Sequence, residues 1–258
     1  MKHDGDQATA GETCLFWDDG AHDPAWNMAA DEVLLLTARE RGLAVLRFYQ
    51  WNVPSVSIGY VQPFDAVDAG DGVDIVRRPT GGGIVYHNND FTYSVVVPAH
   101  HWLTDLDRVS SYEWINRAIQ KGLEYSQLPA SLAQNSIPRS VDRSTMVCFH
   151  HPTRYDIVAG DRKIAGSAQR RTRDGLLHQG SINLESVPGM ERVDLAQSVV
   201  RGFEDVMKSH LQPWMPPCDF LRFVEDRREQ RYCTAEWLRS ARDSRQPSGQ
   251  EAHERKRD

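Results

Sequence analysis

Apolar residues recur along this chain with two different spacings, and the spacing at each point predicts the local structure. Apolar positions three and four residues apart predict helices over residues 24–41, 107–127, 193–210 and 219–240, with a short helix at 63–69. Runs rich in β-branched and aromatic residues predict strands at 13–18, 43–50, 54–59, 73–77, 83–87, 91–97, 154–159, 162–168 and 177–183. Hairpins mixed with helices favour an α+β fold over a doubly wound parallel sheet.

Single residues mark several of the expected element ends. Leu34–Leu36 are expected to fill the buried side of the first long helix, and Gly42 is expected to end it. Asp107 or Ser110 is the expected N-cap of the next long helix. A hairpin turn is predicted at Gly160–Asp161, between two of the strands.

The composition bounds the class of protein. A chain of 258 residues suits one large domain or two small ones with a sizeable core. The formal net charge of −6 argues against a nucleic-acid binder, which usually needs a basic face. No apolar run approaches the roughly 20 residues that cross a bilayer, so no membrane partner is expected. Residues 1–12 and 241–258 are polar and are expected to be disordered, which leaves 13–240 as the folded domain.

The four cysteines, Cys14, Cys148, Cys218 and Cys233, show no tight pairing. In a chain of this length that pattern indicates reduced thiols and a cytoplasmic protein. Most free cysteines are inert packing residues, and this is our interpretation of three of them. Cys148 differs because it borders a Pro- and Ser-rich loop and precedes Phe-His-His-Pro. It is a candidate nucleophile if Lys163, fifteen positions further on, folds back to supply the cation that a reactive thiolate needs.

Three successive glycines, Gly81–Gly83, lie between two predicted strands. The segment is neither a P-loop nor a dinucleotide-binding fingerprint, because neither glycine pattern is present. Bare backbone allows close approach to a ligand, and its N–H groups could polarise an acyl carbonyl or bind a phosphate. Arg77 and Arg78, just before the glycines, could add positive charge. The alternative is a flexible hairpin turn with two solvated arginines.

The histidines give no metal site. His150 and His151 are adjacent, so in a strand they point to opposite faces, and no Cys, His or Asp grouping has zinc-like spacing. Either histidine lines a pocket mouth or has no role. His87 contacts the substrate or satisfies a strand-end carbonyl, and the residues leave both open. The cluster Arg170–Arg173 is interpreted as a solvated hairpin turn in preference to a docking patch for an acidic protein partner.

Together, four segments resemble the biotin/lipoate A/B protein ligase superfamily: Arg77–His87, Phe91–Ser94, Asp161–Arg170 and His178–Ile182. The resemblance covers residues 13–240, and although each motif is short, their order and spacing agree. It implies an α+β catalytic domain with a mixed, largely antiparallel sheet flanked by helices. It also implies an enzyme that transfers a lipoyl, octanoyl or biotinyl group to a lysine of an acceptor domain.

Within that superfamily, the segment Cys148–Asp156 resembles the cysteine-dependent octanoyltransferase branch, which also places its nucleophile fifteen residues before the lysine. This branch implies octanoyl transfer from acyl carrier protein to a lipoyl domain or the glycine-cleavage H protein, through a cysteine thioester and without a cofactor. Gly83 instead keeps the glycine common among ATP-dependent lipoate–protein ligases, which would need ATP and Mg²⁺. Two further functions stay open, an octanoyl amidotransferase and a non-catalytic lipoate-binding module.

The resemblance also implies roles for individual residues. Cys148 would be the nucleophile and Lys163 its electrostatic partner. Backbone amides of the glycines and of Ser167 would hold the carbonyl oxygen, and Val85, Tyr86 and Ile164 would wall the acyl slot. The expected substrate-binding residues are Arg78, Gly81, Gly82, Gly83, Val85, Tyr86, His87, Ile164, Gly166, Ser167 and Ala168.

Overall fold

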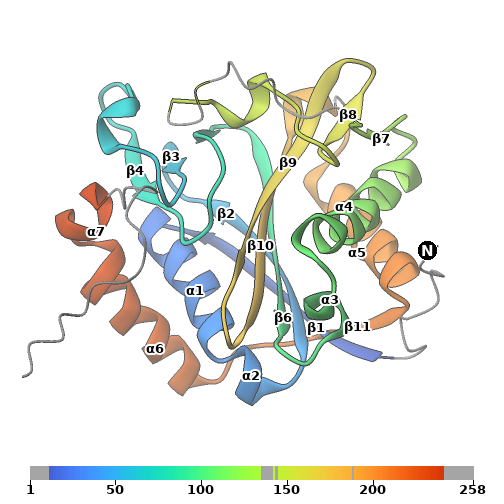
Figure 1. Ribbon diagram of the computed structural model, residues 1–258, viewed down its shortest axis with the longest axis horizontal. Coiled ribbons are helices and arrows are strands. Elements are labelled where there is room, and N and C mark those ends of the chain that lie inside the picture. Colours follow the sequence, from blue (N-terminus) through green and yellow to red (C-terminus); the bar gives the residue numbers. More distant parts are fainter. Residues whose placement is uncertain (1–11, 135–141, 143–144, 188, 241–258) are drawn as a thin grey trace, which may run out of the picture.

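Two β-sheets and the helices around them form the part of the chain that the computed structural model describes, residues 12–134, 142, 145–187 and 189–240 (Figure 1). The larger sheet has eight strands in the order β11-β1-β2-β6-β10-β9-β8-β7. These strands are β1 (Glu12–His22), β2 (Ala44–Trp51), β6 (Asp90–Pro98), β7 (Ser131–Leu132), β8 (Ile157–Ala159), β9 (Arg162–Arg171), β10 (Gly175–Asn183) and β11 (Ser209–Pro213). The smaller sheet has the order β4-β3-β5, formed by β3 (Ser55–Ile58), β4 (Asp74–Arg77) and β5 (Val85–His87).

The strand pairing confirms the expected fold class. β1 runs parallel to β2 and β11, whereas β2, β6, β10, β9, β8 and β7 pair antiparallel in that order. In the smaller sheet β3 pairs parallel with β4 and antiparallel with β5. The fold is therefore α+β with a mixed, largely antiparallel sheet.

Helices cover both faces of the larger sheet. α4 (Arg108–Tyr125) and α5 (Arg192–Met207) pack together on one face, and α1 (Pro24–Leu36) and α6 (Cys218–Arg227) lie on the other (Figure 1). β6 contributes side chains to both hydrophobic cores. Tyr93 and Val95 belong to the core shared with α4 and α5, whereas Val96 belongs to the core shared with α1. Successive side chains of a strand point to opposite faces, so Thr92 falls on the same face as Val96. This alternation decides which residues reach the pocket described below.

The first long helix is interrupted. The predicted helix 24–41 is divided into α1 and α2 (Ala38–Arg41) at Thr37, whose hydroxyl donates to the Val33 carbonyl at 2.8 Å. A Thr side chain bonded to the carbonyl four residues earlier competes with regular helix geometry. Leu36 is 37% exposed, so its predicted burial is wrong, whereas Leu34 and Leu35 are buried. Gly42 ends α2 in the left-handed region (φ 72°), as predicted.

The other helices also deviate from prediction near their ends. Residues 219–240 form α6, a π-helical turn η4 (Arg228–Tyr232) and α7 (Ala235–Arg239). The helix predicted to reach residue 210 ends at Met207, because Lys208 adopts a left-handed conformation (φ 52°) before β11. Asp107 caps α4 through its carboxylate, as predicted. The sequence analysis missed β7, β11 and α3 (Trp102–Asp105).

Short 3₁₀ turns complete the structure: η1 (Phe64–Ala66), η2 (Cys148–His150) and η3 (Leu184–Ser186). η1 replaces the helix predicted at 63–69. Residues 1–11 and 241–258, expected to be disordered, lie outside the described residues, and Glu12 is the first residue of β1.

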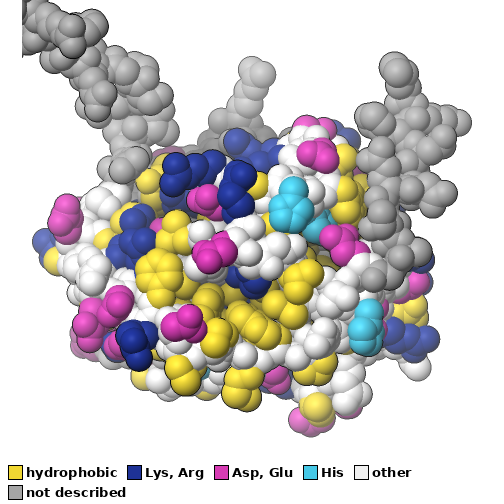
Figure 2. Space-filling model, turned by 90° about the horizontal axis from the view of Figure 1, so that it is seen from below, with side chains coloured by type: hydrophobic (Ala, Val, Ile, Leu, Met, Phe, Trp, Pro, Cys, Tyr) yellow, Lys and Arg dark blue, Asp and Glu magenta, His cyan; other side chains and the backbone are white. Residues whose placement is uncertain are grey.

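Seen from below, the surface carries a central group of hydrophobic side chains, with basic and acidic side chains interspersed around it (Figure 2). Non-specific nucleic-acid binding uses a continuous basic surface, which this face does not present. Within the described ranges, no helix combines the length and apolar character that a membrane crossing requires.

His178 in β10 makes the free energy of unfolding depend on pH. It is fully buried, and burial lowers its pKa from 6.5 to about 3. Between these two values the unfolded chain binds a proton that the folded chain excludes. The free energy of unfolding should therefore fall as pH drops below 6.5, by up to about 1.4 kcal/mol per pH unit from this residue.

We expect His178→Gln to remove that contribution. Denaturant titrations of both proteins between pH 6.5 and 4 should give a shallower pH dependence for the variant. Equal slopes for the two proteins would contradict this account of His178.

Candidate active site

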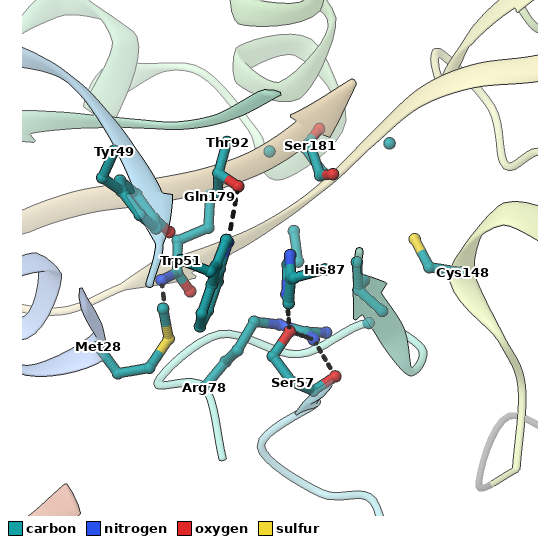
Figure 3. Close-up of a pocket in the computed structure, with 16 residues that line it drawn as sticks. Met28, Tyr49, Trp51, Ser57, Arg78, His87, Thr92, Cys148, Gln179 and Ser181 are labelled. Atoms are coloured by element: carbon teal, nitrogen blue, oxygen red, sulfur yellow. Dashed lines mark hydrogen bonds between the residues drawn. The ribbon is translucent and has the colours of Figure 1, made fainter. Parts of the chain in front are cut away.

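A pocket of about 390 Å³, partly open to solvent, lies between the two sheets (Figure 3). Strands from both sheets, helix α1 and the turn η2 contribute to its wall. The lining residues are Met28, Tyr49, Trp51, Ser57, Arg78, Gly82, Val85, His87, Thr92, Cys148, Gly166, Ser167, Ala168, Gln179, Gly180 and Ser181.

Cys148 reaches this pocket because its loop pairs with the chain just after the glycine run. The Ile84 N–H donates to the Met146 carbonyl, and the Cys148 N–H donates to the Ile84 carbonyl, both at 2.8 Å. Cys148 then opens η2, with its side chain 9% exposed and facing the pocket (Figure 3). The two segments that the sequence analysis singled out are therefore neighbours in space.

Gly83 is required by this pairing. A Cβ atom at position 83 would lie 2.5 Å from the Met146 carbonyl oxygen and 3.0 Å from the Cys148 nitrogen, closer than real Cβ contacts. Only glycine lets the two backbones approach this closely. The third glycine of the run thus has a structural reason in this chain, in addition to any role toward a ligand.

Lys163 meets Cys148 as predicted. The β8–β9 hairpin turns at Gly160 and places the Lys163 Nζ 3.4 Å from the Cys148 Sγ and 2.7 Å from the Cys148 carbonyl oxygen. The same ammonium lies 2.7 Å from the Asp156 carboxylate. Burial acts to lower the pKa of Lys163, but the Cys148 thiolate and the Asp156 carboxylate outweigh it and raise that pKa. Lys163 is therefore a buried cation at neutral pH, which is what stabilisation of a thiolate requires.

Asp156 is a member of the site that the sequence analysis did not assign. Its carboxylate accepts hydrogen bonds from the Tyr112 hydroxyl at 2.6 Å and from the N–H and hydroxyl of Thr153 at 2.6 and 2.8 Å. These donors, together with Lys163, hold a carboxylate that is 1% exposed. The signal was present, because Asp156 ends the segment that carries the resemblance.

Gly166 and Ser167 in β9 form the wall beside the thiol. A Cβ at Gly166 would lie 2.6 Å from the Lys163 Nζ and 3.2 Å from the Cys148 Sγ, so glycine leaves room for both groups. The Ser167 carbonyl accepts from the Tyr112 hydroxyl and so points away from β10. In an antiparallel strand the N–H of a residue points to the same side as its carbonyl, so the Ser167 N–H faces away from β10 as well.

The two arginines before the glycines are not solvated, because both guanidinium groups donate to backbone carbonyls. Arg78 lines the pocket, but its guanidinium donates to Ser57 and to the carbonyls of Gly81 and Gly83 at 2.7 to 2.9 Å. Burial lowers the pKa of Arg78 to about 10, which leaves it charged at neutral pH. The alternative of a flexible hairpin turn with solvated arginines is therefore wrong, and Arg78 holds the glycine run in place.

Arg77 is fully buried and connects distant parts of the chain. Its guanidinium donates to the carbonyls of Gly59, Tyr60 and Gln62 and to those of Trp237 and Leu238. The indole N–H of Trp237 returns a bond to the Arg77 carbonyl at 3.1 Å. The role expected for Arg77, a charge for a ligand, is not what the structure shows.

Several predicted contacts lie elsewhere because strand alternation was not resolved from the sequence. Val85 and His87 line the pocket, but Tyr86 between them is 40% exposed and outside it. Ile164 follows Lys163 and is 1% exposed in the core shared with α4 and α5, so it does not wall the acyl slot. Gly82 and Ala168 are in the lining, as expected, whereas Gly81 and Gly83 are not.

His87 does not satisfy a strand-end carbonyl, and its contact with a substrate stays a prediction. Its Nδ1 lies 2.8 Å from the Asp90 carboxylate, its Nε2 lies 2.6 Å from the Ser57 hydroxyl, and its ring stacks on Trp51 with centroids 3.9 Å apart. The ring itself contributes to the pocket wall.

Two arginines of the basic cluster donate to backbone carbonyls. Arg170 donates to the Pro79 carbonyl, and Arg171 donates to the carbonyls of Leu103, Thr104, Leu106 and Asp107, so the expectation of solvated side chains is wrong for both. His151 is exposed. No group of three or more potential metal ligands occurs in the described part of the chain.

The sequence analysis missed half of the pocket lining. The missed residues are Met28, Tyr49, Trp51, Ser57, Thr92, Gln179, Gly180 and Ser181. Met28 belongs to α1. The other residues come from predicted strands, but the sequence did not indicate which face of its strand each residue occupies.

Comparison with known proteins identifies the family. Residues 23–210 match the model of the lipoyl protein ligase A/B catalytic domain. The chain belongs to this family. Within it, the chain is 32% identical to octanoyltransferase LipM of Bacillus subtilis, over 88% of this chain and 98% of that protein. It is 37% identical to octanoyltransferase LipM of Staphylococcus aureus, over 66% of each chain.

Solved structures share the fold of this lipoyl protein ligase domain. Lipoate-protein ligase A bound with ATP superposes with a TM-score of 0.74 at 22% identity, covering 90% of this chain and 100% of that one. A bi-partite lipoate protein ligase from Thermoplasma acidophilum gives 0.74 at 19% identity, covering 90% and 98%. At these identities the likeness concerns the fold alone.

The close approach at Gly83 predicts that alanine substitutions at Gly83 and Gly81 differ sharply in their effect on the reactivity of Cys148. Gly83→Ala should push the Cys148 loop away from Lys163 and lower the rate of Cys148 alkylation by iodoacetamide about tenfold at pH 7. Gly81→Ala is the matched control, because a Cβ there meets nothing within 4 Å. Peptide mass mapping would follow Cys148 separately from the other thiols. Equal rates for the two variants would contradict the packing argument.

Removing the cation should have a similar effect without moving the loop. In Lys163→Met the thiolate loses its contact partner, so alkylation of Cys148 at pH 7 should slow by about tenfold or more. Lys121→Met removes an exposed lysine that pairs with Glu124 and should leave the rate unchanged. An unaltered rate in Lys163→Met would show that the ammonium does not support the thiolate.

Proposed function

We propose that this protein is an octanoyltransferase of protein lipoylation, in which Cys148 carries the octanoyl group between two proteins. Octanoyltransferase relatives over nearly the whole chain support the reaction class. The observation that carries the covalent route is the 3.4 Å contact between the Cys148 Sγ and the Lys163 Nζ at the wall of the pocket.

In the first half-reaction the Cys148 thiolate attacks the carbonyl carbon of an octanoyl thioester on acyl carrier protein. A new carbon–sulfur bond forms as the bond to the carrier sulfur breaks, and the carrier leaves as a thiolate that takes a proton from water. Lys163 stabilises the attacking thiolate, and the Ser167 amide N–H donates to the developing oxyanion. The product is an octanoyl thioester on Cys148.

In the second half-reaction the neutral amine of an acceptor lysine attacks the acyl-enzyme. The amide bond forms, the amine loses a proton to solvent, and the Cys148 thiolate leaves toward the Lys163 ammonium. Converting a thioester to an amide is downhill, so we propose that the reaction needs no ATP. The acceptor we propose is a small lipoyl domain or the glycine-cleavage H protein.

The pocket provides for an acyl chain. Met28, Tyr49 and Trp51 lie at the end away from Cys148 (Figure 3). Burying hydrocarbon is worth about 0.8 kcal/mol per methylene, so a chain of octanoyl length gains several kcal/mol from a dry pocket.

The decisive experiment is intact-mass analysis after incubation with octanoyl-acyl carrier protein. Wild type should gain one octanoyl group that maps to Cys148, and Cys148→Ser should lose the thioester together with nearly all transfer to a lipoyl domain. Cys233→Ser, a change at an exposed thiol outside the pocket, is the control and should behave as wild type.

The competing functions give different results in the same assay. A ligase would require ATP and free octanoate and would work without Cys148. An amidotransferase would take octanoyl from an octanoylated protein in preference to the carrier, and a non-catalytic module would bind ligand without transfer. Full octanoyl transfer by Cys148→Ser would end the proposal.

A further inference from the structure

The wall of the pocket is rich in polar side chains, which is unexpected for a site that takes a hydrocarbon chain. Ser57, His87, Thr92, Gln179 and Ser181 all line it. Each of them, however, is hydrogen-bonded to another protein group. What matters for a ligand is therefore the direction of these bonds.

One series of bonds begins at a cation and ends at an anion. The Arg78 guanidinium donates to the Ser57 hydroxyl oxygen at 2.7 Å, and that hydroxyl lies 2.6 Å from the His87 Nε2. The His87 Nδ1 lies 2.8 Å from the Asp90 carboxylate. A carboxylate can only accept, so Nδ1 carries a proton that points at Asp90. The Ser57 hydroxyl oxygen is engaged by both Arg78 and His87.

Asp90 accepts hydrogen bonds from two further hydroxyl groups of the pocket wall, those of Thr92 and Ser181. The same carboxylate oxygen that meets His87 also accepts from the Thr92 hydroxyl at 2.9 Å and from the Ser181 hydroxyl at 2.6 Å. Burial acts to raise the pKa of Asp90, but His87 and the two hydroxyls outweigh it and hold that pKa below its usual value. Asp90 is thus a buried anion that turns three donors away from the ligand space.

The side-chain amide of Gln179 is also hydrogen-bonded to other protein groups. Its Nε2 donates to the Asp31 carboxylate at 2.7 Å, and its Oε1 accepts from the Thr80 hydroxyl at 2.6 Å. The Thr92 oxygen, in turn, accepts from the Trp51 indole N–H at 2.9 Å. The side chains of the polar wall therefore offer a ligand few unused hydrogen-bond donors.

We propose that Asp90 sets the substrate specificity of this site, making it select unsubstituted hydrocarbon acyl chains and reject the same chains carrying a hydroxyl group. The inference rests on the proposed acyl transfer to Cys148. A hydroxyl entering this pocket gives up its bonds to water and meets groups whose donors already point at Asp90 and Asp31. A buried hydroxyl whose oxygen finds no donor costs on the order of 2 kcal/mol, which corresponds to roughly 30-fold in rate at about 1.4 kcal/mol per tenfold.

The test on the wild-type protein compares three carrier-protein thioesters: octanoyl, 3-hydroxyoctanoyl and 6-hydroxyoctanoyl. The measured quantity is kcat/KM for acylation of Cys148, followed by intact mass. Both hydroxylated chains should acylate Cys148 at least about tenfold more slowly than octanoyl. A smaller ratio for either hydroxylated chain overturns the proposal.

The variant Asp90→Asn tests whether the carboxylate is responsible. The three donors share one carboxylate oxygen, and the neutral amide oxygen of Asn accepts hydrogen bonds more weakly than a charged one, so some of the donors would turn toward the ligand. We expect the ratio of octanoyl to hydroxyoctanoyl rates to fall by about tenfold, because the hydroxylated chains gain partners. An unchanged ratio in folded Asp90→Asn would assign the specificity elsewhere and refute the role of Asp90.

Asp19→Asn is the matched control. Asp19 likewise accepts from a histidine and an arginine, His22 and Arg47, but neither Asp19 nor these partners line the pocket. Both variants should lose stability in a thermal melt, and only Asp90→Asn should change the substrate ratio. A purely structural role for Asp90 would slow all three thioesters equally.

The experiment separates this inference from the proposed function. If octanoyl does not become attached to Cys148, the proposed acyl transfer fails. If octanoyl and both hydroxylated chains become attached at similar rates, acyl transfer stands and only the specificity proposal fails.

Discussion

One buried ammonium group, shared between a cysteine sulfur and a carboxylate, is the interaction on which the rest of this site depends. Lys163 has three hydrogens and three close acceptors: the Cys148 sulfur, the Cys148 carbonyl and the Asp156 carboxylate. Burial alone favours the neutral amine, so the charge persists only because its partners are held in place. Tyr112 and Thr153 hold Asp156, and the pairing with Ile84 holds Cys148.

The contact between sulfur and ammonium also spans the two sheets. Lys163 belongs to β9 of the larger sheet, whereas the Cys148 loop is bonded to Ile84, next to β5 of the smaller sheet. The close backbone approach at Gly83 is to Met146 and Cys148, so it holds the Cys148 loop against the edge of the smaller sheet. The pocket thus lies between the two sheets, and its geometry depends on both.

Local sequence patterns were sufficient for most of the fold and for the reactive pair. The β8–β9 hairpin follows from its turn at Gly160, and that hairpin returns Lys163 toward Cys148. The same patterns could not decide which strand face Val85 or Tyr86 occupies, because a shift by one residue exchanges the two faces. They also could not show that Arg77 is buried, since its acceptors are carbonyls as distant as Trp237.

Polar partners across the fold were the least predictable part. Asp90 and Ser181 are 91 residues apart in sequence and 2.6 Å apart in space, and only the register between β6 and β10 brings them together. Asp156 stands in a segment that the sequence marks, but its role depends on the distant Tyr112. Long-range pairing, which no local spacing encodes, decided these cases.

The bonds between Arg77 and α7 have a consequence for how such proteins change over time. The family match ends at residue 210, yet Trp237 and Leu238 hold the guanidinium of Arg77, whose neighbour Arg78 holds the glycine run. The segment that matches the family model and the segment that supports the glycine run therefore have different boundaries. A chain that exchanged its C-terminal segment would also exchange the support of the glycine run, so a change beyond the matched region reaches the pocket without altering any residue that lines it.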